Sequence, residues 1–134
     1  MDRRKFLQAG SALTLIGLSS AAPSAFAMRG AKVVVIGGGY GGATAAKYVR
    51  LLSDNQIEVT LIEPNKEFIS CPMSNLVIGG SRQLADITRP YTALTKVHGV
   101  RVIHDMASAI DSTARTITLA GGTTLSYDKL VVSP

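Results

Sequence analysis

Tryptophan is absent from this chain, and cysteine occurs once, at position 71. One cysteine cannot form a disulfide or a redox-active dithiol pair within the 134 residues. Acidic residues are also few, with 9 Asp and Glu against 14 Lys and Arg. No internal repeat, low-complexity tract or heptad pattern is present. The length therefore allows one modest domain, and the pattern excludes a repeat protein and a coiled coil.

The first 27 residues have the composition of an export signal. A charged head at residues 1–8 precedes an apolar run at residues 9–22, and small residues follow at Ala25 and Ala27. The run is too short and too rich in serine and glycine for a comfortable membrane span. We expect cleavage after Ala27, a periplasmic mature protein, and no stable membrane span in the mature chain.

The charged head carries Arg3 and Arg4, followed by Phe6 and Leu7, and resembles a twin-arginine export signal. Such signals carry folded proteins, which usually hold a cofactor. An ordinary Sec signal that contains two arginines is the alternative. Cleavage after residue 27 also removes three basic residues and one acidic residue, so the formal net charge falls from +5 to +3. That excess is too small to indicate a nucleic-acid partner.

Residues 32–63 have the pattern of a strand, a helix and a second strand. The β-branched run at residues 32–36 is typical of a strand that is buried on both faces of a parallel sheet. Glycines at positions 37, 39 and 42 then match G-x-G-x-x-G, and a helix is expected over residues 41–52. A second apolar strand at residues 57–62 ends at an acidic residue. This arrangement predicts an α/β fold, a Rossmann-like dinucleotide-binding domain with a parallel sheet.

Each residue of this motif has an expected role. Gly37 permits the tight turn, Gly39 lets the backbone approach a pyrophosphate, and Gly42 allows the helix to pack closely on the strand. The helix N-terminus then points its free N–H groups at the phosphates, so packing is the expected role of the Tyr40 ring. Glu63 can accept hydrogen bonds from a ribose, and its charge disfavours a 2′-phosphate. The dinucleotide is therefore FAD or NAD rather than NADP.

The remaining sequence favours FAD. In flavoenzymes that bind two dinucleotides the FAD unit comes first, and here the motif stands at the start of the mature chain. A third strand is predicted at residues 99–104, and a β-meander and a last buried strand follow at residues 107–111, 116–119, 124–126 and 127–132. Because such a sheet would normally continue, we interpret residues 28–134 as the N-terminal part of an FAD-binding domain that is truncated at its C-terminus.

A family resemblance runs from residue 32 to residue 134. The glycine turn, the segment Val-Thr-Leu-Ile-Glu-Pro-Asn, the ten residues that begin at Cys71, and Tyr-Asp-Lys-Leu-Val-Val together resemble the flavoprotein subunit of flavocytochrome c sulfide dehydrogenase. This subunit belongs to the FAD-dependent pyridine nucleotide-disulfide oxidoreductase superfamily. Glutathione reductase-like enzymes share the turn and the last strand but arrange their cysteines differently, so the Cys71 segment is the specific part.

The resemblance implies a covalent FAD, bound by a thioether from Cys71 to the C8 methyl group of the flavin. It also implies that sulfide is the substrate, that electrons pass through a disulfide to FAD, and that a cytochrome c subunit accepts them. The disulfide cysteines of that route are absent from these residues, so we name no catalytic residue and expect this chain alone to be inactive. The alternative for Cys71 is a buried structural thiol, or half of a disulfide with a partner elsewhere.

Two other interpretations of the function stay open. One is a sulfide:quinone or NADH-linked flavin oxidoreductase with noncovalent FAD, and the other is a nucleotide-binding fragment without catalysis. No metal site is expected, because His98 and His104 lack partners at ligand spacing. The positions that we expect to bind the cofactor are Gly37, Gly38, Gly39, Tyr40, Gly41, Gly42, Glu63, Pro64, Cys71 and Ala107.

The export signal generates the first prediction. Replacing Arg3 and Arg4 together by lysine keeps the charge of the head but removes the arginine pair that the twin-arginine receptor reads. We expect the protein to stay in the cytoplasm, uncleaved, when cell fractions are compared by immunoblot. An unchanged periplasmic yield of the protein beginning at Met28 would assign the signal to the Sec pathway instead.

Overall fold

The computed structural model describes residues 30–134 of the chain. The predicted signal, residues 1–27, and the predicted first mature residue, Met28, lie outside the described residues and stay predictions. Within residues 30–134, none of the helices has the length and apolar character needed to cross a membrane.

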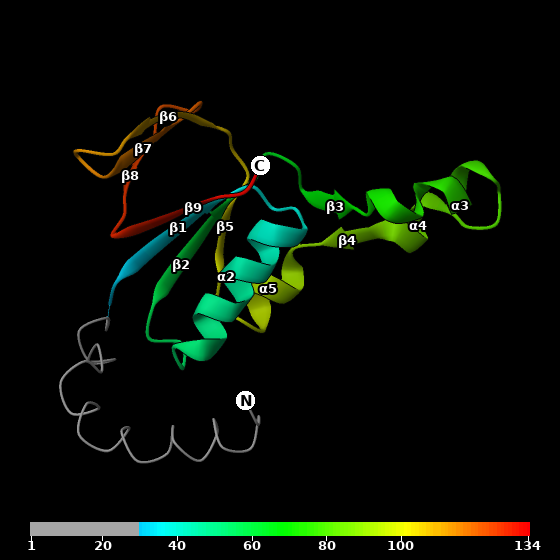
Figure 1. Ribbon diagram of the computed structural model, residues 1–134, viewed down its shortest axis with the longest axis horizontal. Helices are drawn as coiled ribbons and strands as arrows, with labels where there is room; N and C mark the ends of the chain where they lie inside the picture. The colour runs from blue at the N-terminus through cyan, green and yellow to red at the C-terminus, as the bar shows by residue number, and fades with distance from the viewer. Residues whose placement is uncertain (1–29) are drawn as a thin grey trace, which may run out of the picture.

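A four-stranded parallel sheet forms the centre of the fold (Figure 1). Its strands stand in the order β5, β2, β1, β9, and they span Arg101–Ile103, Glu58–Ile62, Lys32–Ile36 and Lys129–Val132. The helix α2 (Tyr40–Leu52) connects β1 to β2, which pair in parallel from Lys32 opposite Glu58 to Ile36 opposite Ile62. The predicted α/β fold with a parallel sheet is confirmed, since parallel neighbours joined by a helix are its defining unit.

Side chains of β1 alternate between the two faces of the sheet, and both faces are covered. On one face, Val35 packs with Ala46 of α2 in a buried cluster that lies beneath α2 and α5 (Thr92–Lys96). On the other face, Val34 packs with Ile117 in a second buried cluster. Val34 and Val35 are 2% and 0% exposed, which agrees with the β-branched run predicted to be buried on both faces.

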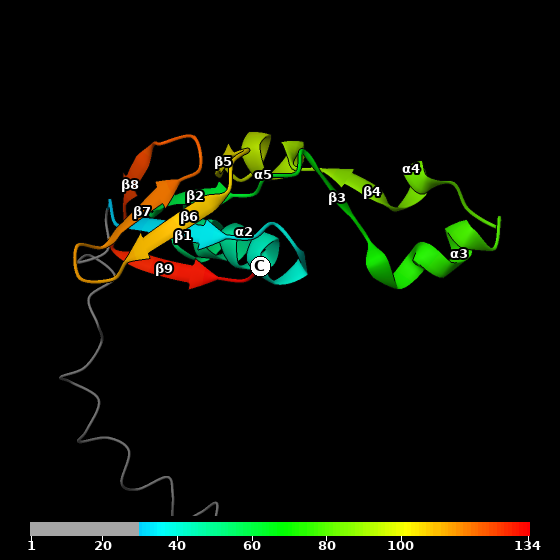
Figure 2. The same cartoon turned by 90° about the horizontal axis from the view of Figure 1, so that it is seen from above.

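The second face is covered by the β-meander. Its strands β6 (Ala107–Asp111), β7 (Thr116–Leu119) and β8 (Thr124–Ser126) pair antiparallel, in the order β6, β7, β8. They have the bounds that the sequence predicts. Figures 1 and 2 show the meander on the opposite side of the sheet from α2. Ile117, at the centre of β7, is fully buried and joins the meander to the sheet.

The bounds of the other predicted elements shift by one or two residues at their ends. Two strands begin two residues later than predicted: β5 at Arg101 rather than at residue 99, and β9 at Lys129 rather than at residue 127. Directly before β9, Asp128 makes two hydrogen bonds with the start of β1: its N–H donates to the carbonyl of Lys32 at 2.8 Å, and its carboxylate accepts from the N–H of Lys32 at 2.7 Å. The carboxylate thus fixes where β9 joins the sheet.

Residues 67–90 form an extension, here called the arm, for which the sequence predicts no element. Its base is an antiparallel pair, β3 (Glu67–Ile69) and β4 (Thr88–Pro90). Between them lie a 3-10 turn, η2, and two short helices, α3 and α4, which span Cys71–Met73, Ser74–Ile78 and Leu84–Ile87. Figures 1 and 2 both show the arm projecting away from the sheet and α2. These elements have three to five residues each, too short to show a period in the sequence.

Two positions of the turn after β1 require glycine, Gly37 for its backbone conformation and its close contacts and Gly42 for its close contacts. Gly37 has a φ of +98°, and a Cβ there would lie 2.0 Å from the carbonyl oxygen of Ser133. A Cβ on Gly42 would lie 1.8 Å from the carbonyl oxygen of Gly37 and 3.3 Å from Val35. The start of α2 therefore sits directly on the end of β1, closer than any side chain would permit.

The contact at Gly42 generates the second prediction. Gly42→Ala forces backbone against backbone, so we expect a loss of more than about 3 kcal/mol in the free energy of unfolding, beyond ordinary overpacking. Gly39→Ala is the matched control, because a Cβ there meets no atom within 4 Å, and we expect it to cost less than about 1 kcal/mol. Urea denaturation of the full-length protein measures both. Equal losses would show that the close approach at Gly42 is not what stabilises the fold.

Candidate dinucleotide-binding site

The turn of residues 37–42, here called the phosphate loop, stands at the carboxyl end of β1 and leads into α2. Gly39 is the N-cap of α2 and makes no side-chain cap hydrogen bond. No acidic residue occupies the first turn of the helix. The first N–H groups of an α-helix have no partner inside the helix, and the helix dipole makes this end positive. The loop therefore offers backbone donors and a favourable potential to an anionic group.

The three neighbouring glycines of the loop differ in what surrounds them. A Cβ on Gly38 would lie 2.4 Å from the hydroxyl of Tyr91, and one on Gly41 would lie 2.6 Å from Oγ of Ser133. A Cβ on Gly39 would meet nothing within 4 Å. Gly39 is thus the position where the loop faces open space, and a ligand can approach the backbone there. A phosphate-binding loop requires this feature, so the geometry fits a bound pyrophosphate.

Glu63 follows directly after β2 and is only 8% exposed. One carboxylate oxygen accepts a hydrogen bond from the N–H of Gly38 at 2.7 Å. The other accepts from the backbone N–H and the side-chain amide of Asn65, at 2.9 and 2.7 Å. From the sequence, the one role expected of Glu63 is to accept hydrogen bonds from a ribose. The structure adds that it holds the phosphate loop, and a carboxylate has further lone pairs for a ribose hydroxyl.

Tyr91 is a site residue that the sequence does not reveal. It lies between β4 and α5, it is 7% exposed, and its hydroxyl donates to the carbonyl of Gly38 at 3.0 Å. Burial, with a smaller contribution from the charge of Glu63, raises the pKa of Tyr91 to about 12. The hydroxyl therefore stays protonated and remains a donor at physiological pH. A single tyrosine 53 residues from the loop gives no sequence signal for this contact.

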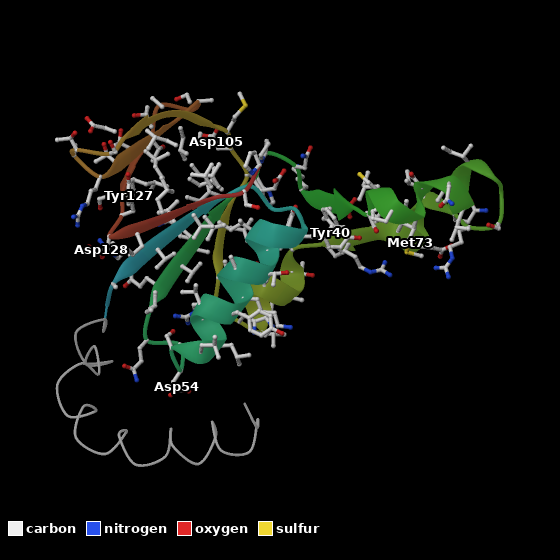
Figure 3. The ribbon with its side chains drawn as sticks, viewed as in Figure 1. Tyr40, Asp54, Met73, Asp105, Tyr127 and Asp128 are labelled. Atoms are coloured by element: carbon white, nitrogen blue, oxygen red, sulfur yellow. The ribbon has the colours of Figure 1, made fainter. Side chains whose placement is uncertain are left out.

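A pocket of about 380 Å³ lies between the phosphate loop, the arm and α5. Its lining is mainly apolar, and Tyr40 is one of the residues that line it on the side of the loop. The Tyr40 ring packs edge-on against Phe68 of β3, with centroids 4.8 Å apart, and its hydroxyl hydrogen-bonds to Ser70. Figure 3 shows Tyr40 between α2 and the arm, with Met73 farther along the arm. Tyr40 thus packs, as expected, and it connects the loop to the arm.

Cys71 is the first residue of η2 and follows Ser70 directly. Its thiol is free and exposed, so residues 30–134 do not bury it, and a disulfide with a partner elsewhere stays an alternative. The hydrogen bond between Ser70 and Tyr40 holds the start of η2 near the phosphate loop. The sulfur itself makes a long contact, 3.9 Å, to the carbonyl of Ile69. The structure therefore presents an accessible thiol on the segment that adjoins the loop.

Most of the predicted cofactor-binding positions do not line the pocket. Of the ten, only Gly38, Gly39 and Tyr40 line the pocket. Pro64 is exposed after Glu63, and Ala107 packs, partly buried, against the second core cluster. Their contacts with a cofactor stay predictions.

The histidine that follows β5 has a structural partner. Nδ1 of His104 lies 3.2 Å from the carbonyl of Glu63 and 3.0 Å from that of Asn65, so the ring helps to hold the segment after β2. Within residues 30–134, no group of three or more His, Cys, Asp or Glu side chains is placed to hold a metal ion. His104 is therefore a satisfied side chain of the fold.

Comparison with known proteins agrees with this geometry. The family described as pyridine nucleotide-disulphide oxidoreductase matches residues 31–134. The chain belongs to this family. The predicted resemblance is confirmed by the flavoprotein chain of the flavocytochrome c sulfide dehydrogenase of Chlorobaculum thiosulfatiphilum, which is 59% identical over 46 residues, 34% of this chain and 94% of that sequence.

A second relative from this family matches a larger share of the chain. The sulfide-quinone reductase of Aquifex aeolicus is 35% identical over 101 residues, 75% of this chain. The solved structure of the sulfide:quinone oxidoreductase from that bacterium superposes with a TM-score of 0.68 at 36% identity, over 76% of this chain and 24% of that one. The chain spans 23% of the length of the Aquifex relative.

The phosphate loop generates the third prediction. Gly39→Val places a branched side chain in the open space beside the loop, so we expect it to abolish dinucleotide binding while the protein still folds. Glu63→Gln keeps the size of the side chain but removes the charge that holds Gly38, and we expect a partial loss. Absorbance of retained dinucleotide after desalting, with circular dichroism of each full-length variant, measures both effects. Equal losses of dinucleotide binding in the two variants would mean that the phosphates do not bind at Gly39.

Proposed function

We propose that this chain is the FAD-binding part of a periplasmic, flavin-dependent oxidoreductase that oxidises sulfide and passes the electrons to a cytochrome c subunit. The observation that carries the proposal is the exposed thiol of Cys71 on the segment that Tyr40 and Ser70 hold against the phosphate loop. The identity of 59% with a flavocytochrome c sulfide dehydrogenase flavoprotein chain supports the substrate and the electron acceptor.

The residues present fit FAD. The open backbone at Gly39 and the uncapped start of α2 would bind the pyrophosphate, and the buried carboxylate of Glu63 would bind the ribose of the adenosine half. No basic side chain is needed, because backbone N–H groups and the helix dipole neutralise the phosphates. When bound, FAD would supply a carrier that takes two electrons from sulfide sulfur and releases them singly.

Cys71 would anchor the flavin by a thioether. The Sγ atom of Cys71 would hold the C8 methyl carbon, and FAD itself would supply the two-electron oxidation that replacing one S–H and one C–H bond by a C–S bond requires. The reaction needs a thiol that is accessible and close to the methyl group more than it needs extra catalytic groups. The exposure of Cys71 meets the first condition. A covalent flavin is also retained in the periplasm, where a lost cofactor would be diluted.

A second candidate function is that of a quinone-reducing flavoprotein with noncovalent FAD. The similarity to the Aquifex sulfide-quinone reductase favours it, because that relative matches 75% of this chain at 35% identity. The two candidates share the phosphate loop and differ in what Cys71 does. The state of the flavin therefore separates them.

The fourth prediction is that FAD in the full-length protein is covalently bound to Cys71. After acid denaturation and proteolysis, mass spectrometry should find a flavin on the peptide that contains Cys71. Cys71→Ser should release the flavin on denaturation but leave FAD bound in the native protein, since the loop residues are unchanged. Ser74→Ala is the matched control: Ser74 hydrogen-bonds to the carbonyl of Cys71, and its loss should leave the flavin attached. A wild-type protein that loses all its flavin in acid would favour the quinone-reducing function.

A further inference from the structure

We propose that Tyr91 is a positioning residue of the phosphate loop: by binding the carbonyl of Gly38, it aims the N–H of Gly39 at the pyrophosphate of a bound dinucleotide. Tyr91 comes from the start of α5, far from the glycine motif in the sequence. The inference rests on the proposed dinucleotide site and adds a residue that controls its affinity.

The geometry of one peptide unit carries the argument. The described residues contain no cis peptide bond, so the carbonyl of Gly38 and the N–H of Gly39 point in opposite directions. The hydroxyl of Tyr91 holds that carbonyl at 3.0 Å. The N–H of Gly39 is thereby held pointing away from Tyr91. Within residues 30–134 this N–H donates to no backbone carbonyl, and Gly39 faces open space.

Glu63 restrains the preceding peptide unit, which joins Gly37 to Gly38, through the N–H of Gly38. Its carboxylate accepts the N–H of Gly38 at 2.7 Å, while Tyr91 holds the carbonyl of the same residue. Glycine has more backbone freedom than any other residue, so a loop of successive glycines does not fix its own donors. Two buried side chains from different elements fix them here. Each restraint reduces the ordering that a ligand would otherwise have to impose.

Tyr91 is itself firmly placed. Its carbonyl accepts hydrogen bonds from the N–H and from Oγ1 of Thr95, both at 3.2 Å, and its ring belongs to the buried core cluster beneath α2. The ring also lies 6.2 Å from that of His104, which is bonded to the segment after β2. The hydroxyl therefore reaches the loop from a rigid base. Burial raises the pKa of Tyr91 to about 12, so its hydroxyl stays protonated and can donate at neutral pH.

The chain contains a matched control for this contact. Tyr127, labelled in Figure 3, directs its hydroxyl to the carbonyl of Asp111 at 3.5 Å in the meander, across the sheet from α2. Tyr127→Phe and Tyr91→Phe each remove a tyrosine hydroxyl that is bonded to a backbone carbonyl. Only the second removal affects the phosphate loop.

The test measures reversible binding in the full-length protein that carries Cys71→Ser, so that flavin does not become covalent. Dissociation constants of FAD, ADP and adenosine are measured with and without Tyr91→Phe. We expect about a fivefold to tenfold weaker binding of FAD and ADP, the effect of about one hydrogen bond. Adenosine has no phosphate, so its affinity should not change. Tyr127→Phe should leave all three constants unchanged.

The outcomes separate three conclusions. Equal weakening of ADP and adenosine by Tyr91→Phe would mean that Tyr91 only stabilises the fold, and unchanged ADP binding would mean that the loop keeps its orientation without it. Either result overturns the inference. A Cys71→Ser parent that folds but binds neither FAD nor ADP would contradict the proposed dinucleotide site itself. Selective loss of the phosphate-bearing ligands would support both.

Discussion

The buried hydrogen bond from the N–H of Gly38 to the carboxylate of Glu63 is the interaction on which the site depends. It joins the ends of two strands, and it exists only because β1 and β2 pair in parallel with Ile36 opposite Ile62. That register places the turn after β1 beside the residue after β2. A hydrogen bond to a charged group is stronger than one between neutral groups. Glu63 is only 8% exposed, so water does not compete for its carboxylate. The glycine-rich loop thus has a fixed shape before any ligand arrives.

The same edge of the sheet also positions the arm. The chain leaves β2 at Glu63, and four residues later it enters β3, so η2 and its cysteine begin beside the phosphate loop. Tyr40 then connects the two through Phe68 and Ser70. The sheet and α2 are closely packed, whereas the arm projects from them (Figure 2). The glycine-rich loop and the thiol of Cys71 therefore lie on different parts of the chain, one on the packed sheet and helix and the other on the projecting arm.

Much of the fold follows from local sequence. The β-branched run of β1, the strands of the meander with their turns, and the helix after the glycines are read from period and turn chemistry, which act over a few residues. The arm could not be predicted, because its elements are too short to repeat a pattern, and its strands pair residues as far apart as Glu67 and Pro90. Small differences at element ends have a similar origin: β9 begins where Asp128 binds Lys32, 96 residues earlier in the chain.

By itself, the sequence determined the dinucleotide-binding class of the fold, the place of the phosphate loop, and the acidic residue at the end of the second strand. These features depend on residue types at fixed spacing, because the turn, the helix start and the strand end are local structures. Only the tertiary structure decided that Glu63 holds the loop, that Tyr91 binds Gly38 from the opposite side, and that the thiol of Cys71 is exposed. The contacts of Gly38 join residues 25 and 53 positions apart, and such contacts arise from packing, which leaves no period in the sequence.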